Sequence, residues 1–389
     1  MTELPQDDEA TTPVAVASVA ALPGPMVAAE PHHRPRWRAF LRQYRRPMQL
    51  VPLVAGALLL VIPGQAPTSA LLVGLSVLNA AMGVRREGWA AATEASLEIS
   101  SLHDELDRLT SRILAVAGIA LVLSIAIGLA WGLGAEALLL VAVALAVAAL
   151  PNGLPLAMAA SRSRGMGTEH VPLRPIRFGL ACLFGFIATF LGSSVVGIFA
   201  GIPFAPLGTL WINFTVGVFG MVGLGRGELR ESLEGSPRRP SRILPGTLAA
   251  WLVVCGFVMA VGTVGIAVYA KNTWDEPAAR TMALVTFSLF HLWLALETAD
   301  PRRSMVSPGI LRNPTLLRAT IASLVAIALA VTLAPLAQLL RTTGLALDQW
   351  LLCLAVSLTI VVVAEAKKRL RLDAGGEVEA AGTFAVVPT

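Results

Sequence analysis

Charge is scarce in this sequence. Only 14% of the 389 residues are charged and 55% are hydrophobic, whereas a soluble domain carries charge at roughly a quarter of its positions. The mean hydropathy of +0.71 excludes an ordinary water-soluble protein. Apolar runs of about 20 residues, long enough to cross the core of a bilayer, recur along the chain. The lipid bilayer is therefore the expected solvent for most of the fold.

Reactive and metal-binding motifs are scarce as well. Cys182, Cys255 and Cys353 lie in apolar runs without CxxC or Cys/His spacing, so we interpret them as small core residues. There is no GxxxxGK[ST] phosphate loop and no aspartate between Asp107 and Asp275. The net charge of +5 does not indicate nucleic acid binding, because the cations lie in short loops beside apolar runs. No cofactor is expected.

Ten apolar segments are interpreted as transmembrane helices. They occupy about residues 48–64, 67–84, 113–133, 136–160, 177–200, 206–224, 246–270, 279–298, 315–338 and 347–366. The polar segment 85–111 predicts a cytoplasmic linker between the second and third helices. Residues 1–34 predict a disordered cytoplasmic tail, and residues 373–389 a second cytoplasmic tail. The expected fold class is an all-α integral membrane protein with its membrane domain at 35–372.

Arginine marks one set of loops. The cations on that side are Arg85, Arg86, Arg162, Arg164, Arg174, Arg177, Arg226, Arg230, Arg238, Arg239, Arg242, Arg302, Arg303, Lys367, Lys368, Arg369 and Arg371. The opposite loops are short, with Lys271, Arg280 and Arg341 as exceptions. The positive-inside rule predicts a multi-pass protein with both termini in the cytoplasm. The preference for arginine over lysine is common in G+C-rich bacteria, so the plasma (inner) membrane is the expected location.

The fourth predicted helix contains a break. It contains the sequence Pro151-Asn152-Gly153-Leu154-Pro155, whose prolines and glycine remove helical hydrogen bonds and free backbone carbonyls at mid-membrane. The sequence closely resembles the Pro-Glu-Gly-Leu-Pro signature of calcium-type (P2-type) cation-transporting P-type ATPases. In that family the carbonyls and the glutamate coordinate the cation. Here Asn152 replaces the glutamate.

Further segments resemble the same family in the correct order, over roughly residues 40–372. They are Leu75–Gly83 for the second helix, Leu210–Asn213 for the sixth, Ala279–Ala283 for the eighth, and Arg302-Arg303-Ser304 with Asn313 for the loop before the ninth. The resemblance implies about ten helices arranged like the P-type ATPase transmembrane domain.

Two cytoplasmic insertions that define the family have no counterpart. Segment 85–111 takes the place of the actuator domain and lacks Thr-Gly-Glu, and segment 161–176 takes the place of the phosphorylation and nucleotide-binding domains. No Asp-Lys-Thr-Gly sequence occurs, so no carboxylate is available to accept a phosphoryl group. We therefore expect a protein that is not an enzyme and does not bind ATP.

The family's cation ligands can be traced onto this chain. The asparagine and glutamate of the fifth helix fall on Ile187 and Phe190, and the threonine and aspartate of the sixth fall on Val216 and Gly217. No carboxylate remains at these positions. Calcium bound by neutral oxygens alone would lack charge compensation, so no metal site is expected.

Three polar residues remain at the mapped site: Asn152, Asn213 and His291. They form a candidate vestigial ligand pocket beside the helix break at Pro151 and Pro155, because polar groups within the membrane are costly and often functional. The alternative is structural. An intramembrane Asn or His also bonds across helices or satisfies carbonyls freed by proline.

Three functions follow from the sequence. The first is a catalytically inactive binding, regulatory or scaffold protein, whose partner docks on segments 85–111, 161–176 or 225–245. The second is a passive or secondary transporter or channel that carries a cation or small solute through the broken fourth helix. The third is the transport subunit of a split P-type pump.

Overall fold

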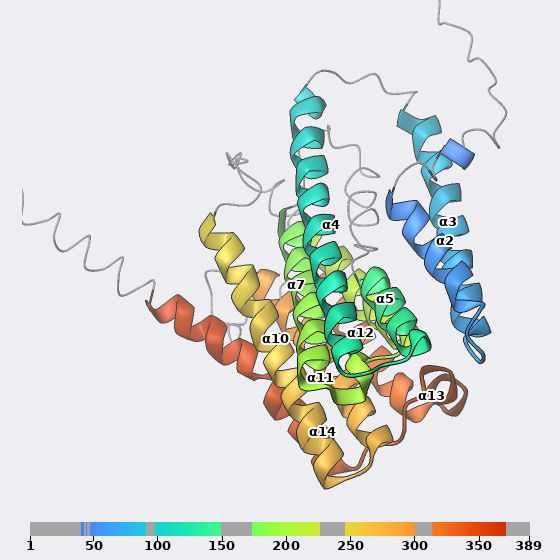
Figure 1. Ribbon diagram of the computed structural model, residues 1–389. Coiled ribbons are helices and arrows are strands. Elements are labelled where there is room, and N and C mark those ends of the chain that lie inside the picture. Colours follow the sequence, from blue (N-terminus) through green and yellow to red (C-terminus); the bar gives the residue numbers. More distant parts are fainter. Residues whose placement is uncertain are drawn as a thin grey trace, which may run out of the picture.

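A computed structural model describes residues 40–42, 44, 47–90, 98–148, 173–225, 246–299 and 313–370 (Figure 1). These residues form helices and contain no strand, which confirms the all-α fold class. The predicted tails 1–34 and 373–389 lie outside the described residues. So do the helix break at Pro151–Pro155, with Asn152, and most of the proposed docking segments 161–176 and 225–245.

The described residues fold into a series of helices. Their bounds are α2 (Pro47–Leu59), α3 (Ala66–Ala90), α4 (Glu98–Ala130), α5 (Ala135–Ala148), α7 (Leu173–Val196), η1 (Ile198–Gly201), α8 (Pro206–Ile212), η2 (Asn213–Gly217), α10 (Gly246–Thr273), α11 (Glu276–Ala299), α12 (Pro314–Thr332), α13 (Ala334–Leu340) and α14 (Leu347–Ser357). The helix of η2 continues to Gly225, and helical structure after α14 reaches Leu370.

Six helices within the described residues are long and apolar enough to cross a membrane. They are Leu173–Val196, Pro206–Gly225, Leu248–Thr273, Glu276–Ala299, Pro314–Thr332 and Leu347–Leu370. Four shorter apolar helices, Leu50–Leu59, Ala66–Leu78, Ala115–Ala130 and Ala135–Ala148, overlap the first four predicted spans. The structure therefore gives a multi-pass membrane protein, and the count of ten spans stays a prediction.

Local chemistry sets the bounds of α12. At its start, Asn313 Oδ1 accepts hydrogen bonds from the backbone N–H groups of Thr315 and Leu316, both at 3.1 Å. This is an N-cap, which satisfies donors that the first turn leaves unpaired. At its end, Leu333 is extended with φ −81° and ψ 107°. Pro335, two residues further on, has no N–H to donate to the Val331 carbonyl, so α12 does not continue through it. The predicted span 315–338 is therefore divided between α12 and α13.

The centre of the bundle is built around α7, α10 and α11. In the most apolar stretch of α11, 78% of the residues are buried, against 28% in that of the C-terminal helix 347–370, so α11 is enclosed and the C-terminal helix lies at the surface of the bundle. Helices α7 and α10 approach closely at Gly256: a Cβ placed there would lie 2.8 Å from the Phe184 carbonyl carbon. Small residues permit such backbone approach between membrane helices.

Helices α2 and α3 form a hairpin at one side of the bundle (Figure 1). Its buried side chains, including Leu59 and Leu72, join a second apolar cluster with Val147 of α5 and Leu210 of α8. Figure 1 shows the turns between α2 and α3, α4 and α5, and α10 and α11 at the same end of the bundle, together with α13. This end carries the short loops that the sequence assigns to the extracytoplasmic side.

At the other end, a buried ion pair joins the C-terminal helix to α11. Lys368 Nζ lies 2.6 Å from Glu297 Oε2, with side-chain exposures of 10% and 11%. Lys368 also lies 3.4 Å from Glu365 of its own helix. Removing one partner of such a pair would leave a buried charge without compensation.

Candidate functional site

Aromatic side chains fill the centre of the bundle. Phe186 of α7 lies 4.5 Å from Phe287 of α11, measured between ring centroids, and 5.2 Å from His291. Phe204, from the segment between η1 and α8, lies 5.0 Å from Phe287 and 6.0 Å from Phe190. All five residues are at most 2% exposed. We call this set, Phe186, Phe190, Phe204, Phe287 and His291, the aromatic cluster.

Helical spacing accounts for the cluster. Phe186 and Phe190 are four residues apart on α7, and Phe287 and His291 are four residues apart on α11, so each pair lies on one face of its helix. The rings meet edge to face or tilted, at the separations that aromatic pairs prefer. The i, i+4 spacing was a sequence signal for this cluster. Sequence reasoning identified only His291 and the position of Phe190.

His291 is held by its own helix. Its ring nitrogen Nδ1 lies 2.9 Å from the carbonyl oxygen of Phe287. Because a carbonyl can only accept, Nδ1 carries the hydrogen and donates. The other ring nitrogen, Nε2, is buried and has no hydrogen-bond partner among the described residues. His291 Nε2 is therefore one uncharged nitrogen surrounded by aromatic rings.

The side chain of Asn213 forms a hydrogen bond to a neighbouring helix. Its side-chain Nδ2 donates a hydrogen bond to the Val147 carbonyl at the end of α5, at 3.3 Å. Val147 precedes Pro151 by four residues, and proline has no N–H, so a helix continuing through residue 151 would leave this carbonyl without its usual donor. Asn213 supplies a donor from a neighbouring helix. The structural alternative raised for this residue thus has a direct observation behind it.

The local backbone brings Asn213 to this position. Residues Asn213–Gly217 form a π-helical turn between α8 and the helix that continues to Gly225. A π-turn widens the helix by one residue and shifts the register of the side chains that follow. Val216 and Gly217, which occupy mapped ligand positions, are buried in this turn without a carboxylate. No sequence signal that we used identifies the π-turn.

Of the candidate pocket residues, the structure describes Asn213 and His291, which bond to different partners, and the pocket stays a prediction. Asn213 donates to Val147, whereas His291 bonds to Phe287, and no hydrogen bond links Asn213 to His291 in the described part of the chain. Asn152 lies outside the described residues. Ile187 and Phe190, at the mapped asparagine and glutamate positions of the fifth helix, are buried in the core. Among the described residues no group of three or more His, Cys, Asp or Glu side chains is placed to hold a metal ion.

Two hydroxyl groups of α7 stand out in the structure: the sequence places Ser193 as a neighbour of the candidate pocket, whereas Thr189 was not singled out. Thr189 Oγ1 and Ser193 Oγ are buried and have no hydrogen-bond partner among the described residues. They lie on the helix that also carries Phe186 and Phe190. A hydroxyl offers an oxygen but no charge, so these groups do not replace the missing carboxylates.

The fold defines a multi-pass, all-α membrane protein. Comparison with known families then identifies part of it: residues 201–370 match the family described as cation transporting ATPase, C-terminus. The matched segment extends from the end of η1 to the end of the C-terminal helix and includes Asn213 and His291. This segment is thus similar to the C-terminal membrane region of P-type cation-transporting ATPases. No curated protein matches the chain. The calcium-type subclass and the missing cytoplasmic domains stay predictions.

Proposed function

We propose that this protein is a catalytically inactive relative of the cation pumps that acts in the membrane as a binding, regulatory or scaffold protein. One observation carries the proposal. The part of the bundle onto which the resemblance maps the cation ligands of the fifth and eighth helices is packed with the aromatic cluster. A pump for divalent cations requires oxygen ligands and compensating carboxylates there.

The packing argues against a cation entering this region. Phe186, Phe190 and Phe287 are completely buried, and interiors of this kind are close-packed, so a ligand would have to displace aromatic side chains. A divalent cation that lost its water ligands there would contact only aromatic ring faces and one imidazole nitrogen. Such an environment does not offset the cost of burying the charge.

The remaining polar groups support the same interpretation. The Asn213 amide is used to satisfy the Val147 carbonyl, so ligand binding would break a contact between two helices. His291 Nε2 offers a single nitrogen ligand, whereas a hard cation such as calcium takes six or more oxygen ligands. Passive transport and service as the transport subunit of a split pump are therefore the less favoured functions.

Reconstitution tests this proposal. Liposomes containing the purified protein should show no calcium or small-solute flux above protein-free liposomes, and no ATP-dependent phosphorylation of the chain. In native membranes, crosslinking from residues within 85–111, 161–176 or 225–245 should recover a protein partner. No ATP binding is expected.

Two results would contradict it. A solute flux that is lost in His291→Phe but retained in the control Ser288→Ala, a neighbour that bonds within its own helix, would establish a transport pathway. Purification as a lone monomer, with no partner crosslinked at any of the three segments, would refute a binding or scaffold role.

A further inference from the structure

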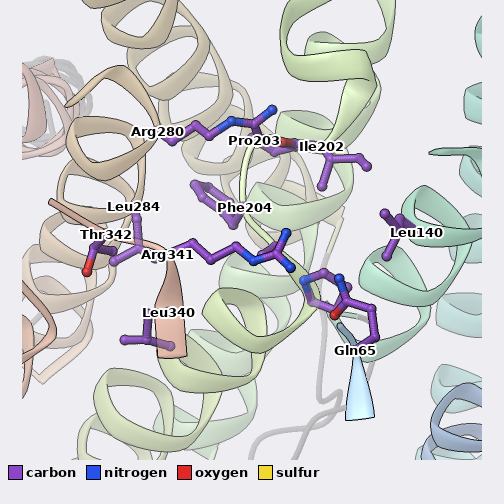
Figure 2. Close-up of a pocket in the computed structure, with 12 residues that line it drawn as sticks. Gln65, Leu140, Ile202, Pro203, Phe204, Arg280, Leu284, Leu340, Arg341 and Thr342 are labelled. Carbon is purple, nitrogen blue, oxygen red and sulfur yellow. Dashed lines mark hydrogen bonds between the residues drawn. The ribbon is translucent and has the colours of Figure 1, made fainter. Parts of the chain in front are cut away.

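A pocket lies at the end of the bundle that carries α13. Its volume is about 260 Å³, and it is bounded by the turn between α2 and α3, the segment before α8, α11 and the loop after α13. Figure 2 shows Arg280 and Arg341 extending in the same direction, on either side of Phe204, toward the side where Gln65, Ile202 and Leu140 lie. This pocket is distinct from the aromatic cluster except for the shared Phe204.

The charged lining of this pocket is cationic. Its residues are Gln65, Leu140, Ile202, Pro203, Phe204, Ala205, Pro206, Arg280, Leu284, Leu340, Arg341 and Thr342, which include two arginines and no carboxylate. The sequence marked both arginines as exceptions, since they fall in loops that are otherwise nearly free of cations. The positive-inside rule therefore does not explain their presence.

Arg341 carries the uncompensated charge. Its guanidinium makes no hydrogen bond or ion pair among the described residues. Nη2 lies 3.6 Å from the position that a Cβ on Gly64 would occupy, so the guanidinium lies against the turn between α2 and α3. Gly64 has φ +77°, which a residue with a side chain rarely adopts. Gln65 follows directly and adds a side-chain amide beside the guanidinium (Figure 2).

The loop that presents Arg341 is fixed in place. Arg341 itself has φ +56°, a conformation that non-glycine residues keep only where their surroundings hold it. The Thr342 hydroxyl donates to the Ala330 carbonyl of α12. The Thr343 N–H donates to Thr281 Oγ1 of α11 at 2.9 Å. The backbone that carries Arg341 is therefore held in place before any ligand arrives.

Arg280 is anchored differently. Its Nε donates to Glu276 at 2.9 Å and its Nη1 donates to the Ile202 carbonyl at 3.1 Å. Its guanidinium also lies 4.3 Å from the centre of the Phe199 ring. Glu276 pairs with Arg280 at 2.9 Å and more distantly with Lys271 at 3.9 Å, so Arg280 contributes shape and hydrogen-bond donors while Arg341 has no carboxylate partner among the described residues.

We propose that this pocket binds a phosphate-bearing anion, from either a phospholipid headgroup or free phosphate. Guanidinium forks match the oxygens of phosphate, and such charge-assisted hydrogen bonds are strong. The volume accommodates a phosphate group with several waters. The apolar walls formed by Leu140, Ile202 and Leu340 suit the glycerol and first methylene groups of a lipid. The proposal goes beyond the scaffold function and does not depend on it.

Calorimetric titration of the full chain in neutral detergent tests the proposal. The probes are short-chain phosphatidylglycerol, short-chain phosphatidylcholine with the same acyl chains, and inorganic phosphate. The variants are Arg341→Gln, Arg341→Lys, and the control Lys271→Gln, which removes a cation from the same end of the bundle outside the pocket lining. Thermal unfolding without ligand establishes that each variant is folded.

We expect at least one anionic probe to bind the wild-type chain more tightly than phosphatidylcholine does. Arg341→Gln should weaken that binding by about tenfold or more, from the loss of a charged hydrogen-bonding group. The affinity of Arg341→Lys should lie between those of wild type and Arg341→Gln, because lysine keeps the charge without the guanidinium fork. Lys271→Gln should bind like wild type. Binding of phosphatidylglycerol alone identifies a lipid site, and binding of inorganic phosphate identifies a site for free anion.

The proposal is overturned if neither anion binds, or if phosphatidylcholine binds as tightly as phosphatidylglycerol. Equal losses in Arg341→Gln and Lys271→Gln would also overturn it, because they would reduce the effect to general surface charge. If Arg341→Gln is unfolded, Arg341→Lys decides: unchanged binding in that variant counts against recognition by the guanidinium fork.

Discussion

The close contact between α7 and α10 at Gly256 allows a direct test of helix packing in this protein. A Cβ on Gly256 would lie 2.8 Å from the Phe184 carbonyl carbon, 2.9 Å from Phe184 Cβ and 3.0 Å from the Gly185 nitrogen. Two of these three atoms belong to the backbone of α7. Rotation of a side chain cannot relieve the overlap, so Gly256→Ala must push the two helices apart.

The expected loss can be worked from these distances. Carbon atoms prefer a separation of at least about 3.5 Å, so the 2.8 Å contact requires a shift of about 0.7 Å (3.5 minus 2.8). Gaps of that size forfeit a quarter to a half of the dispersion energy along the interface, and overpacking typically costs about 1–3 kcal/mol. Alanine regains up to about 1 kcal/mol of helix propensity relative to glycine.

Gly265 of the same helix is the matched control. A Cβ there would have no heavy atom within 4 Å outside its own local backbone. Gly265→Ala therefore has the gain in helix propensity without the overlap. The difference between the two variants isolates the steric term, and Gly256→Ala should be less stable than Gly265→Ala by about 1–3 kcal/mol.

The free energy of unfolding can be measured by titrating sodium dodecyl sulfate into mixed micelles and following far-ultraviolet circular dichroism. Refolding on dilution checks reversibility, which a two-state free energy requires. Gly185→Ala provides a graded comparison, because its Cβ would meet only the flexible Met259 side chain, at 2.8–2.9 Å for the nearest atoms. If Gly256→Ala is as stable as Gly265→Ala, the close approach of α7 and α10 at this glycine is wrong.

Three further contacts can be tested by substitution. Asn213→Ala should lower the free energy of unfolding by about 0.5–2 kcal/mol through loss of the Val147 contact, and an unchanged unfolding curve would refute that bond. Lys368→Met should cost about 3–5 kcal/mol by leaving Glu297 uncompensated. Adding Glu297→Gln should restore most of that stability; no recovery in thermal unfolding would exclude the buried pair as the cause. Asn313→Ala should cost about 1 kcal/mol by removing the α12 cap, whereas Asn313→Asp should retain stability in the same assay.

Hydropathy was sufficient for the helical class because a segment in lipid must satisfy its own backbone hydrogen bonds. The predicted spans 206–224 and 279–298 correspond to helices 206–225 and 276–299 of the structure. The predicted ends of helices were less accurate where a proline interrupts an apolar segment. The division between α12 and α13 depends on Pro335, whose effect hydropathy does not measure.

The candidate site was harder to predict than the fold. Sequence reasoning correctly noted that Asn213 and His291 are polar residues within membrane helices, but it could not tell what they contact. The π-turn at Asn213–Gly217 and the hydrogen bond to Val147 depend on how three segments meet in space. The aromatic cluster likewise combines α7, α11 and the segment that holds Phe204.

The sequence alone determined that this chain lies in the membrane and lacks carboxylates at the mapped cation positions, because hydropathy and residue identity are local properties. It also marked Arg280 and Arg341 as unexpected cations. Only the tertiary structure decided what surrounds these residues. Turns distant in the chain place Arg341 beside Gln65 and Gly64, and packing among α7, α10 and α11 closes the centre of the bundle. Such contacts follow from the arrangement of helices, which no single segment encodes.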